Sequence, residues 1–188
     1  MTTAPAGTPG SVRPALPADA PRIAQVQVDT WRLAYGRVLP ETVLAELDAE
    51  DAAVAWDAAI GSPPSAAHHV LVAVDSASDA VVGFAALTPA DDEDADPVHD
   101  GELAVLLVDP AHGHVGHGSR LLAAAVDVWR SQGVTRAVAW ALDKDDALQG
   151  LLTSAGWAAD GSRRTLENPG NGEGIHQLRL HTDLTPSP

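Results

Sequence analysis

The chain has 188 residues, no cysteine, and 11 basic against 26 acidic residues, which gives a formal net charge of −15 at pH 7. The length fits one domain, and the lack of cysteine excludes a disulfide framework, a thiolate metal site and a thiol nucleophile. A negative field of this size repels nucleic acid and anionic lipid, so we expect neither as a partner.

Small and turn-forming residues at both ends predict short tails at 1–10 and 185–188, around a single domain over 11–184. The first ten residues lack the basic and apolar stretches of a secretory signal. No apolar run approaches the roughly 20 residues that a membrane span needs. We therefore expect a cytoplasmic protein that makes no use of a membrane.

The first third of the domain predicts one strand followed by helices. The strand is expected at Ser11–Arg13, and Asp19 is typical of a helix N-cap. Apolar residues recur after it at the spacing of an amphipathic helix, namely Ile23, Val26, Val28, Trp31 and Ala34. Gly36 would end this helix, Pro40 would open a second one, and Asp51–Ile60 predicts a third.

The pattern then changes to strands. Two β-rich runs, His69–Val74 and Ala80–Leu87, are joined by a polar turn and predict an antiparallel hairpin. The run Thr88–Asp100 is dominated by acidic residues, which repel one another, so we interpret it as a solvated mobile loop; attraction of a cationic amine is the alternative. Leu103–Val108 is almost entirely apolar and predicts a central strand that is buried on both faces.

Helices and strands alternate in the last part. Helices are predicted at Arg120–Arg130 and Asp145–Ala155, and strands at Val134–Leu142, Trp157–Thr165 and Ile175–Leu184. This order predicts an α/β or α+β domain whose sheet has mixed strand directions.

The most informative segment is the turn His112–Ser119, which leads from the central strand into a helix and contains Gly116 and Gly118. Glycine lets the backbone approach a ligand closely. The free N–H groups of a first helical turn, together with the helix dipole, can hold a phosphate or diphosphate without a lysine. A plain tight turn is the alternative, because an isolated Gly-x-Gly is weak evidence.

This segment resembles the acetyl-CoA-binding motif of the GNAT N-acetyltransferase superfamily, in Val108-Asp109-Pro110, Gly116-His117-Gly118 and Leu121-Leu122. Other parts of the chain are similar to family patterns too: Val12–Ala20, Trp31–Tyr35, Leu39–Glu41 and Ser154–Trp157. The resemblance covers most of the chain. It implies a GNAT-like fold, with a mixed, mostly antiparallel central sheet that is splayed after the fourth strand and flanked by helices.

The resemblance also implies a function. It predicts an N-acetyltransferase that moves an acetyl group from acetyl-CoA, as co-substrate, directly to a primary amine of a small molecule. The alternative is a degenerate family member that binds acyl-CoA or a protein partner without turnover. A homodimer formed through the last strands would fit the family.

Residue roles follow from the same resemblance. Pantetheine is expected along the backbone of Leu106, Leu107 and Val108. The other expected cofactor-binding residues are His114, Val115, Gly116, His117, Gly118, Ser119 and Asp145. Trp31 and Tyr35 would border the acceptor site. Glu102 is the candidate base, and a solvated carboxylate at the end of a strand is the alternative interpretation.

Two departures from the family pattern bear on activity. Gly113 stands where the family has Gln or Arg, which is expected to weaken cofactor binding. Leu152 stands where the family has the tyrosine that protonates the departing thiolate, so water or the hydroxyl of Thr153 or Ser154 would have to replace it. The histidines of the glycine turn also allow a zinc site, but we expect neutral imidazoles beside the diphosphate and no bound metal.

Overall fold

One seven-stranded sheet organises the computed structural model, which describes residues 10–35, 47–166 and 174–185. In sheet order the strands are β1 (Ser11–Pro14), β2 (His69–Val74), β3 (Val81–Pro89), β4 (Asp100–Val108), β5 (Arg136–Leu142), β7 (Ile175–Asp183) and β6 (Ala158–Leu166). Neighbouring strands are antiparallel except β4 and β5, which are parallel. The mixed, mostly antiparallel sheet that we expected is thus confirmed.

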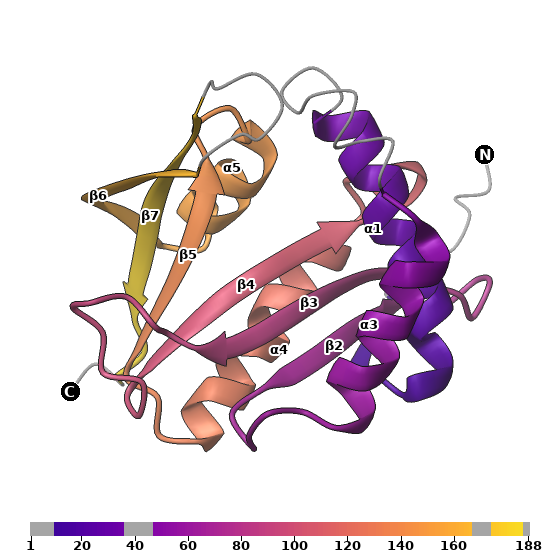
Figure 1. The fold of residues 1–188 in the computed structure, drawn as a ribbon, viewed down its shortest axis with the longest axis horizontal. Coiled ribbons are helices and arrows are strands. Elements are labelled where there is room, and N and C mark those ends of the chain that lie inside the picture. Colours follow the sequence, from indigo (N-terminus) through magenta and orange to yellow (C-terminus); the bar gives the residue numbers. More distant parts are fainter. Residues whose placement is uncertain (1–9, 36–46, 167–173, 186–188) are drawn as a thin grey trace, which may run out of the picture.

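Helices cover both faces of this sheet (Figure 1). They are α1 (Ala20–Tyr35), α3 (Ala49–Gly61), α4 (His117–Ser131) and α5 (Asp146–Ser154), with short 3-10 turns at Pro17–Asp19 and Pro110–His112. The second helix, predicted to open at Pro40, lies outside the described residues. None of the helices in the described part of the chain is long and apolar enough to span a membrane.

Two hydrophobic clusters attach the helices to the sheet. On one face, Ile23 and Val26 of α1 pack with Phe84 of β3, and Trp56 of α3 meets Phe84 edge-on with ring centroids 5.0 Å apart. On the other face, α4 and α5 bury Leu121, Leu122, Ala125, Trp129 and Leu152. These apolar positions recur every three or four residues, so each helix buries one continuous stripe.

Two expectations for the start of the domain need adjustment. Gly10 belongs to the packed structure and not to a tail, because a Cβ at this position would collide with the Val74 carbonyl oxygen. Asp19 immediately precedes α1, but it does not act as the expected N-cap. Its carboxylate accepts hydrogen bonds from Arg13 and from the Leu16 N–H, both at 2.7 Å, and so stabilises the turn before the helix.

The sheet opens between β4 and β5 (Figure 1). The two strands pair only from Asp100–Glu102 to Arg136–Val138, at the start of both strands. Beyond that point they diverge, and a bulge at Ala104 interrupts the pairing of β4 with β3. Ala104 is exposed, so the expectation that this strand is buried on both faces is wrong at its centre. Divergence leaves one edge of β4 without a neighbouring strand.

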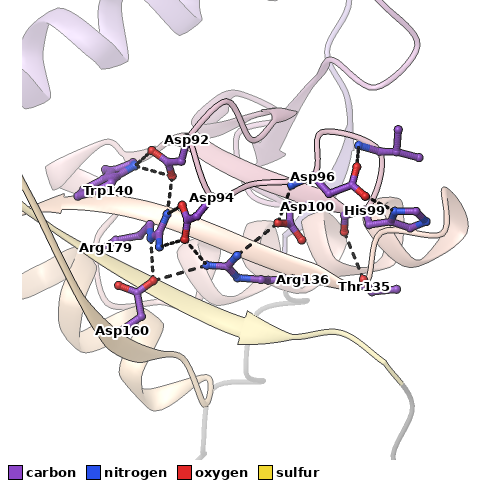
Figure 2. A network of polar contacts seen from close by, with 11 residues as sticks. Asp92, Asp94, Asp96, His99, Asp100, Thr135, Arg136, Trp140, Asp160 and Arg179 are labelled. Carbon is purple, nitrogen blue, oxygen red and sulfur yellow. Dashed lines mark hydrogen bonds and ion pairs between the residues drawn. The ribbon is translucent and has the colours of Figure 1, made fainter.

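The acidic connection between β3 and β4 is not the solvated mobile loop that we expected. Its Asp92 and Asp94 carboxylates bind the guanidinium of Arg179 on β7, at 3.0 and 2.6 Å (Figure 2). Arg179 is only 4% exposed, and its Nε also donates to Asp160 of β6 at 2.7 Å. A buried cation therefore fixes a segment whose charges would otherwise repel one another.

A second arginine extends this network. Arg136 at the start of β5 lies 3.3 Å from Asp100 and 3.6 Å from Asp160 (Figure 2). The indole N–H of Trp140 donates to Asp92 at 3.2 Å. The network thus joins the acidic connection to three strands on the far side of the opening.

Acid should weaken this network. Hydrogen bonding to Arg179 holds the pKa of Asp94 at about 2, well below the ordinary 3.8. Because the folded-state pKa is depressed, the contribution of Asp94 to stability is present above pH 3.8 and lost as the pH falls through about 2. We expect a carboxyl-carbon NMR titration to give Asp94 a midpoint near 2. The melting temperature of Asp94→Asn should fall less steeply over this range than that of the wild type. A midpoint near 3.8 would contradict the ion pair.

Candidate active site

A cleft of about 690 Å³ lies at the open end of the sheet. Nine of the ten residues predicted to bind the cofactor line it: Leu106, Leu107, Val108, His114, Gly116, His117, Gly118, Ser119 and Asp145. The tenth, Val115, is 61% exposed and does not line the cleft. Residues from β4, the glycine turn and α5, which are far apart in the sequence, therefore meet around one space.

The glycine turn forms one wall of this cleft. Gly116 is the N-cap of α4 and adopts a left-handed conformation with φ of 87°, and His114 also has a positive φ of 61°. The helix begins at His117, three residues earlier than predicted, so Gly118 lies in its first turn. A Cβ at Gly118 would lie 3.2 Å from Leu151 Cδ2, so this glycine also permits close packing against α5.

Six successive backbone N–H groups of this turn, those of residues 114–119, donate no hydrogen bond to any described residue. The first backbone bond after them runs from the Arg120 N–H to the Gly116 carbonyl oxygen at 3.1 Å. Unpaired donors at the positive end of a helix bind anions, especially phosphate. Four of these groups, those of residues 116–119, are the donors that every helix leaves unpaired in its first turn, and the preceding glycine turn adds two more, so the turn can hold an anion.

Arg120 adds a positive charge to the turn, which the sequence analysis missed. Its guanidinium folds back over the glycines, donating from Nη2 to the Val115 carbonyl oxygen at 3.2 Å and lying 3.2 Å from His117 Nδ1. The sequence feature that could have indicated this charge is a basic residue one helical turn after Gly116. It lies within the helix and outside the family motif. Arg120 thus places a cation beside Val115 and His117, although it does not itself line the cleft.

His117 is neutral at neutral pH. It is only 2% exposed, and this burial lowers the pKa of the imidazole. The nearby positive charge of Arg120 lowers this pKa further. Among the residues that the structure describes, no group of three or more His, Cys, Asp or Glu side chains is placed to hold a metal ion.

Helix α5 forms the opposite wall. Asp145 caps it, accepting a hydrogen bond from the Leu148 N–H at 3.0 Å. Leu152 is completely buried in the core and does not line the cleft. The hydroxyls proposed to replace the missing tyrosine are engaged elsewhere: Thr153 donates to the Gln149 carbonyl oxygen and Ser154 to that of Leu151, both at 2.7 Å.

Glu102 is not in this cleft. Its neighbours Gly101 and Leu103 face α4, so Glu102 points to the other side of the sheet. It lines a separate cavity of about 620 Å³ together with Arg164 and the acidic connection. Burial raises the pKa of Glu102, and Asp91 and Asp92 raise it further, while Arg164 opposes them. The two cavities lie toward opposite ends of β4.

Of the two aromatic residues predicted at the acceptor site, Trp31 lines neither cavity. Trp31 is partly buried against the hydrophobic cluster under α1, and the side chain of Tyr35 lies outside the described part of the structure. Helix α1 instead contributes Thr30 to the cleft. The sequence analysis missed this residue because a helical threonine next to a tryptophan carries no distinctive pattern.

Comparison with known proteins gives one family. The sequence model of the Acetyltransferase (GNAT) family matches residues 28–157, more than half of the chain. No curated protein matches the chain.

Solved structures of similar fold belong to the same kind of protein. That of yncA from Salmonella typhimurium, with its cofactor acetyl-CoA, is 20% identical with a TM-score of 0.71 and covers 96% of this chain and 97% of that one. Ribosomal-protein-alanine N-acetyltransferase from Brucella melitensis is 23% identical with a TM-score of 0.69, covering 92% and 99%. An N-acetyltransferase from Staphylococcus aureus Mu50 is 17% identical with a TM-score of 0.72, covering 95% and 100%. At these identities the likeness concerns the fold.

Proposed function

Because the chain belongs to the GNAT acetyltransferase family, we propose that it transfers an acetyl group from acetyl-CoA directly to a primary amine of a small molecule. The observation that carries this proposal is the row of N–H groups at residues 114–119 that bond to no described backbone carbonyl, five of whose residues line the same cleft as the open edge of β4. An acidic protein needs such a local device to hold a polyanion. The acetyl-CoA bound to yncA, in a chain of similar fold, also supports it.

Two parts of acetyl-CoA, the diphosphate and the pantetheine arm, would each meet a suitable surface in the cleft. The diphosphate would lie on the N–H groups of residues 114–119, in the turn over which Arg120 folds back. The pantetheine arm would run along Leu106–Val108, where β5 has diverged and backbone groups of β4 lack a neighbouring strand. The arm would then hydrogen-bond to this edge as a strand does, which satisfies the backbone groups of β4.

In the transfer step, the neutral amine attacks the thioester carbonyl carbon and the carbon–sulfur bond breaks, its electron pair passing to sulfur. Backbone N–H groups beside the bulge at Ala104 would stabilise the charge that develops on the carbonyl oxygen. The proton lost by the amine would pass to Glu102 through water. Coenzyme A leaves as a thiolate, a fair leaving group because thiols have a pKa of about 8.5.

The cavity around Glu102 suits an amine acceptor. Asp91, Asp92 and Glu102 line it against one cation, Arg164, so its field attracts an ammonium group. The pKa of Glu102 is raised by burial, which makes its carboxylate a stronger base.

Replacing this carboxylate should slow the reaction. We expect Glu102→Gln to lower kcat/KM by about 10²–10⁴-fold, the usual contribution of a general base. In the wild type, activity should fall as the pH drops through the raised pKa of Glu102, and this acidic limb should be absent from the variant. Thiol release from acetyl-CoA over a panel of primary amines measures both. Asp91→Asn removes the same charge from the same cavity; a loss as large as that of Glu102→Gln would contradict the role of Glu102.

Leu152 favours a second candidate function, a family member that binds acyl-CoA without turnover. The residue is completely buried, and neither Thr153 nor Ser154 has a free hydroxyl proton to replace the missing tyrosine. Calorimetry with acetyl-CoA combined with the thiol-release assay separates the two functions. Binding without release for any amine would establish this candidate, and release would exclude it.

We also propose a homodimer formed through the last strands, since β6 lies at an edge of the sheet. Light scattering should then give twice the 19.4 kDa of one chain, and a monomer mass would contradict it.

A further inference from the structure

Thr30 of α1 has a buried hydroxyl without a partner. The residue is 9% exposed, its Oγ1 makes no hydrogen bond, and it lines the cleft that holds the glycine turn. A helical threonine ordinarily bonds to the carbonyl one turn earlier. Thr153 of α5 does so at 2.7 Å, whereas Thr30 leaves this bond unmade.

An unsatisfied buried hydroxyl destabilises a protein, so such groups are rare and call for an explanation. The placement of Thr30 is well fixed. Two turns earlier in α1, Arg22 donates to the Asp109 carboxylate at 2.6 Å and to the Val81 carbonyl oxygen at 2.9 Å. Those bonds hold α1 beside the end of β4, so Thr30 is held at the wall of the cleft, where rotation of its side chain would bring the hydroxyl to a bound molecule.

The surroundings of Thr30 indicate which part of a ligand it would meet. The cleft is lined on the β4 side by Leu106, Leu107 and Val108, which offer no polar side chain. Ser154, across the cleft, donates its proton to the Leu151 carbonyl oxygen. Thr30 is therefore the side-chain hydroxyl that α1 contributes beside the open edge of β4, whereas the phosphate donors and the Ser119 hydroxyl belong to the glycine turn.

We infer that the Thr30 hydroxyl donates a hydrogen bond to a carbonyl oxygen on the acyl-pantetheine arm of acyl-CoA, either of an amide or of the thioester. The inference rests on the proposed function, since it takes acyl-CoA as the ligand of the cleft. Thr30 is then a positioning residue for the arm. Its unpaired hydroxyl lowers the stability of the free protein and raises the affinity for the ligand.

The test is Thr30→Val, which replaces the hydroxyl by a methyl group of similar size. Without ligand, this variant should melt about 2–4 °C higher than the wild type, because it removes an unsatisfied buried group. By calorimetry it should bind acetyl-CoA about 5–10-fold more weakly, the loss of one hydrogen bond. Its affinity for ADP, which carries the diphosphate without the arm, should be unchanged. Thr30→Ser should restore acetyl-CoA affinity, and Thr153→Val should bind all ligands as the wild type does.

The outcomes separate the inference from the proposed function. Equal weakening of acetyl-CoA and free coenzyme A supports an amide acceptor, and weakening of acetyl-CoA alone supports the thioester oxygen. Unchanged affinity for both, equal weakening of ADP, or a lower melting temperature of Thr30→Val overturns the inference while leaving the proposed function in place. A wild-type protein that binds neither coenzyme A nor ADP overturns both.

Discussion

Gly116→Trp should weaken acetyl-CoA binding by more than about 100-fold. Gly116 lies at the centre of the unpaired N–H groups and has a φ of 87°. A Cβ there would lie 3.0 Å from Arg120 Nη1, the far end of a flexible side chain, so the indole can be accommodated, but only over the turn. It would then cover several donors, each worth about 1.5–3 kcal/mol toward a charged group. Calorimetry measures the loss.

Gly133→Trp provides the matched control. Gly133 lies just after the other end of α4 with a φ of 80°, and nothing lies within 4 Å of its missing Cβ. A side chain at either glycine meets the same left-handed strain, about 1–2 kcal/mol, and should lower the melting temperature similarly. Only Gly116→Trp should lose acetyl-CoA. Equal affinities of the two variants would show that the turn does not hold the ligand.

Arg179→Met should lower the free energy of unfolding by about 3–5 kcal/mol, the cost of removing one partner from a buried ion pair. The variant leaves the Asp92 carboxylate, only 15% exposed, without a cation, and it leaves Asp160, only 16% exposed, with Arg136 alone. It also releases Asp94, which should free the acidic connection between β3 and β4. Urea unfolding measures the stability, and hydrogen exchange of residues 90–99 measures the release.

Arg163→Met is the control for this second prediction. Arg163 lies on β6 and pairs with Asp143 at 3.1 Å, but the two side chains are 67% and 37% exposed. Exposed ion pairs contribute about 0–1 kcal/mol, so this variant should unfold close to the wild type. A similar small loss in Arg179→Met would mean that the network of Figure 2 is not a structural support.

The order and type of the helices and strands were predictable because the spacing of apolar residues reflects which face of each element is buried. The hairpin from β2 to β3, the strand before the glycine turn and the amphipathic helices all follow from such local patterns. The opening between β4 and β5 followed only from the family resemblance. The sequence of a strand that loses its neighbouring strand halfway along is still apolar. No residue pattern indicates that Ala104 is exposed.

The acidic connection shows what local reasoning misses. Read alone, six acidic residues between 91 and 100 repel one another and indicate a solvated loop. Their partner, Arg179, lies 85 residues beyond Asp94 and reaches it only after the last strand joins the sheet. Pairing over such a separation depends on topology, which the spacing of charges does not encode.

The site was predicted unevenly for the same reason. The glycine turn is local, so its residues were identified together and they meet in one cleft. Arg120 and Thr30 are placed by the fold and not by a local pattern: Arg120 folds back over its own helix end, and Thr30 reaches the cleft from α1. Glu102 was identified, but the sequence did not reveal that it faces a different cavity.

The decisive experiment for the glycine turn is a crystal structure of the protein with coenzyme A. If backbone amides of the glycine turn hold the ligand, diphosphate oxygens will lie about 2.7–3.2 Å from the nitrogens of several residues among 114–119. Coenzyme A bound with its diphosphate elsewhere, or a turn whose amides face away from the ligand, would contradict the account.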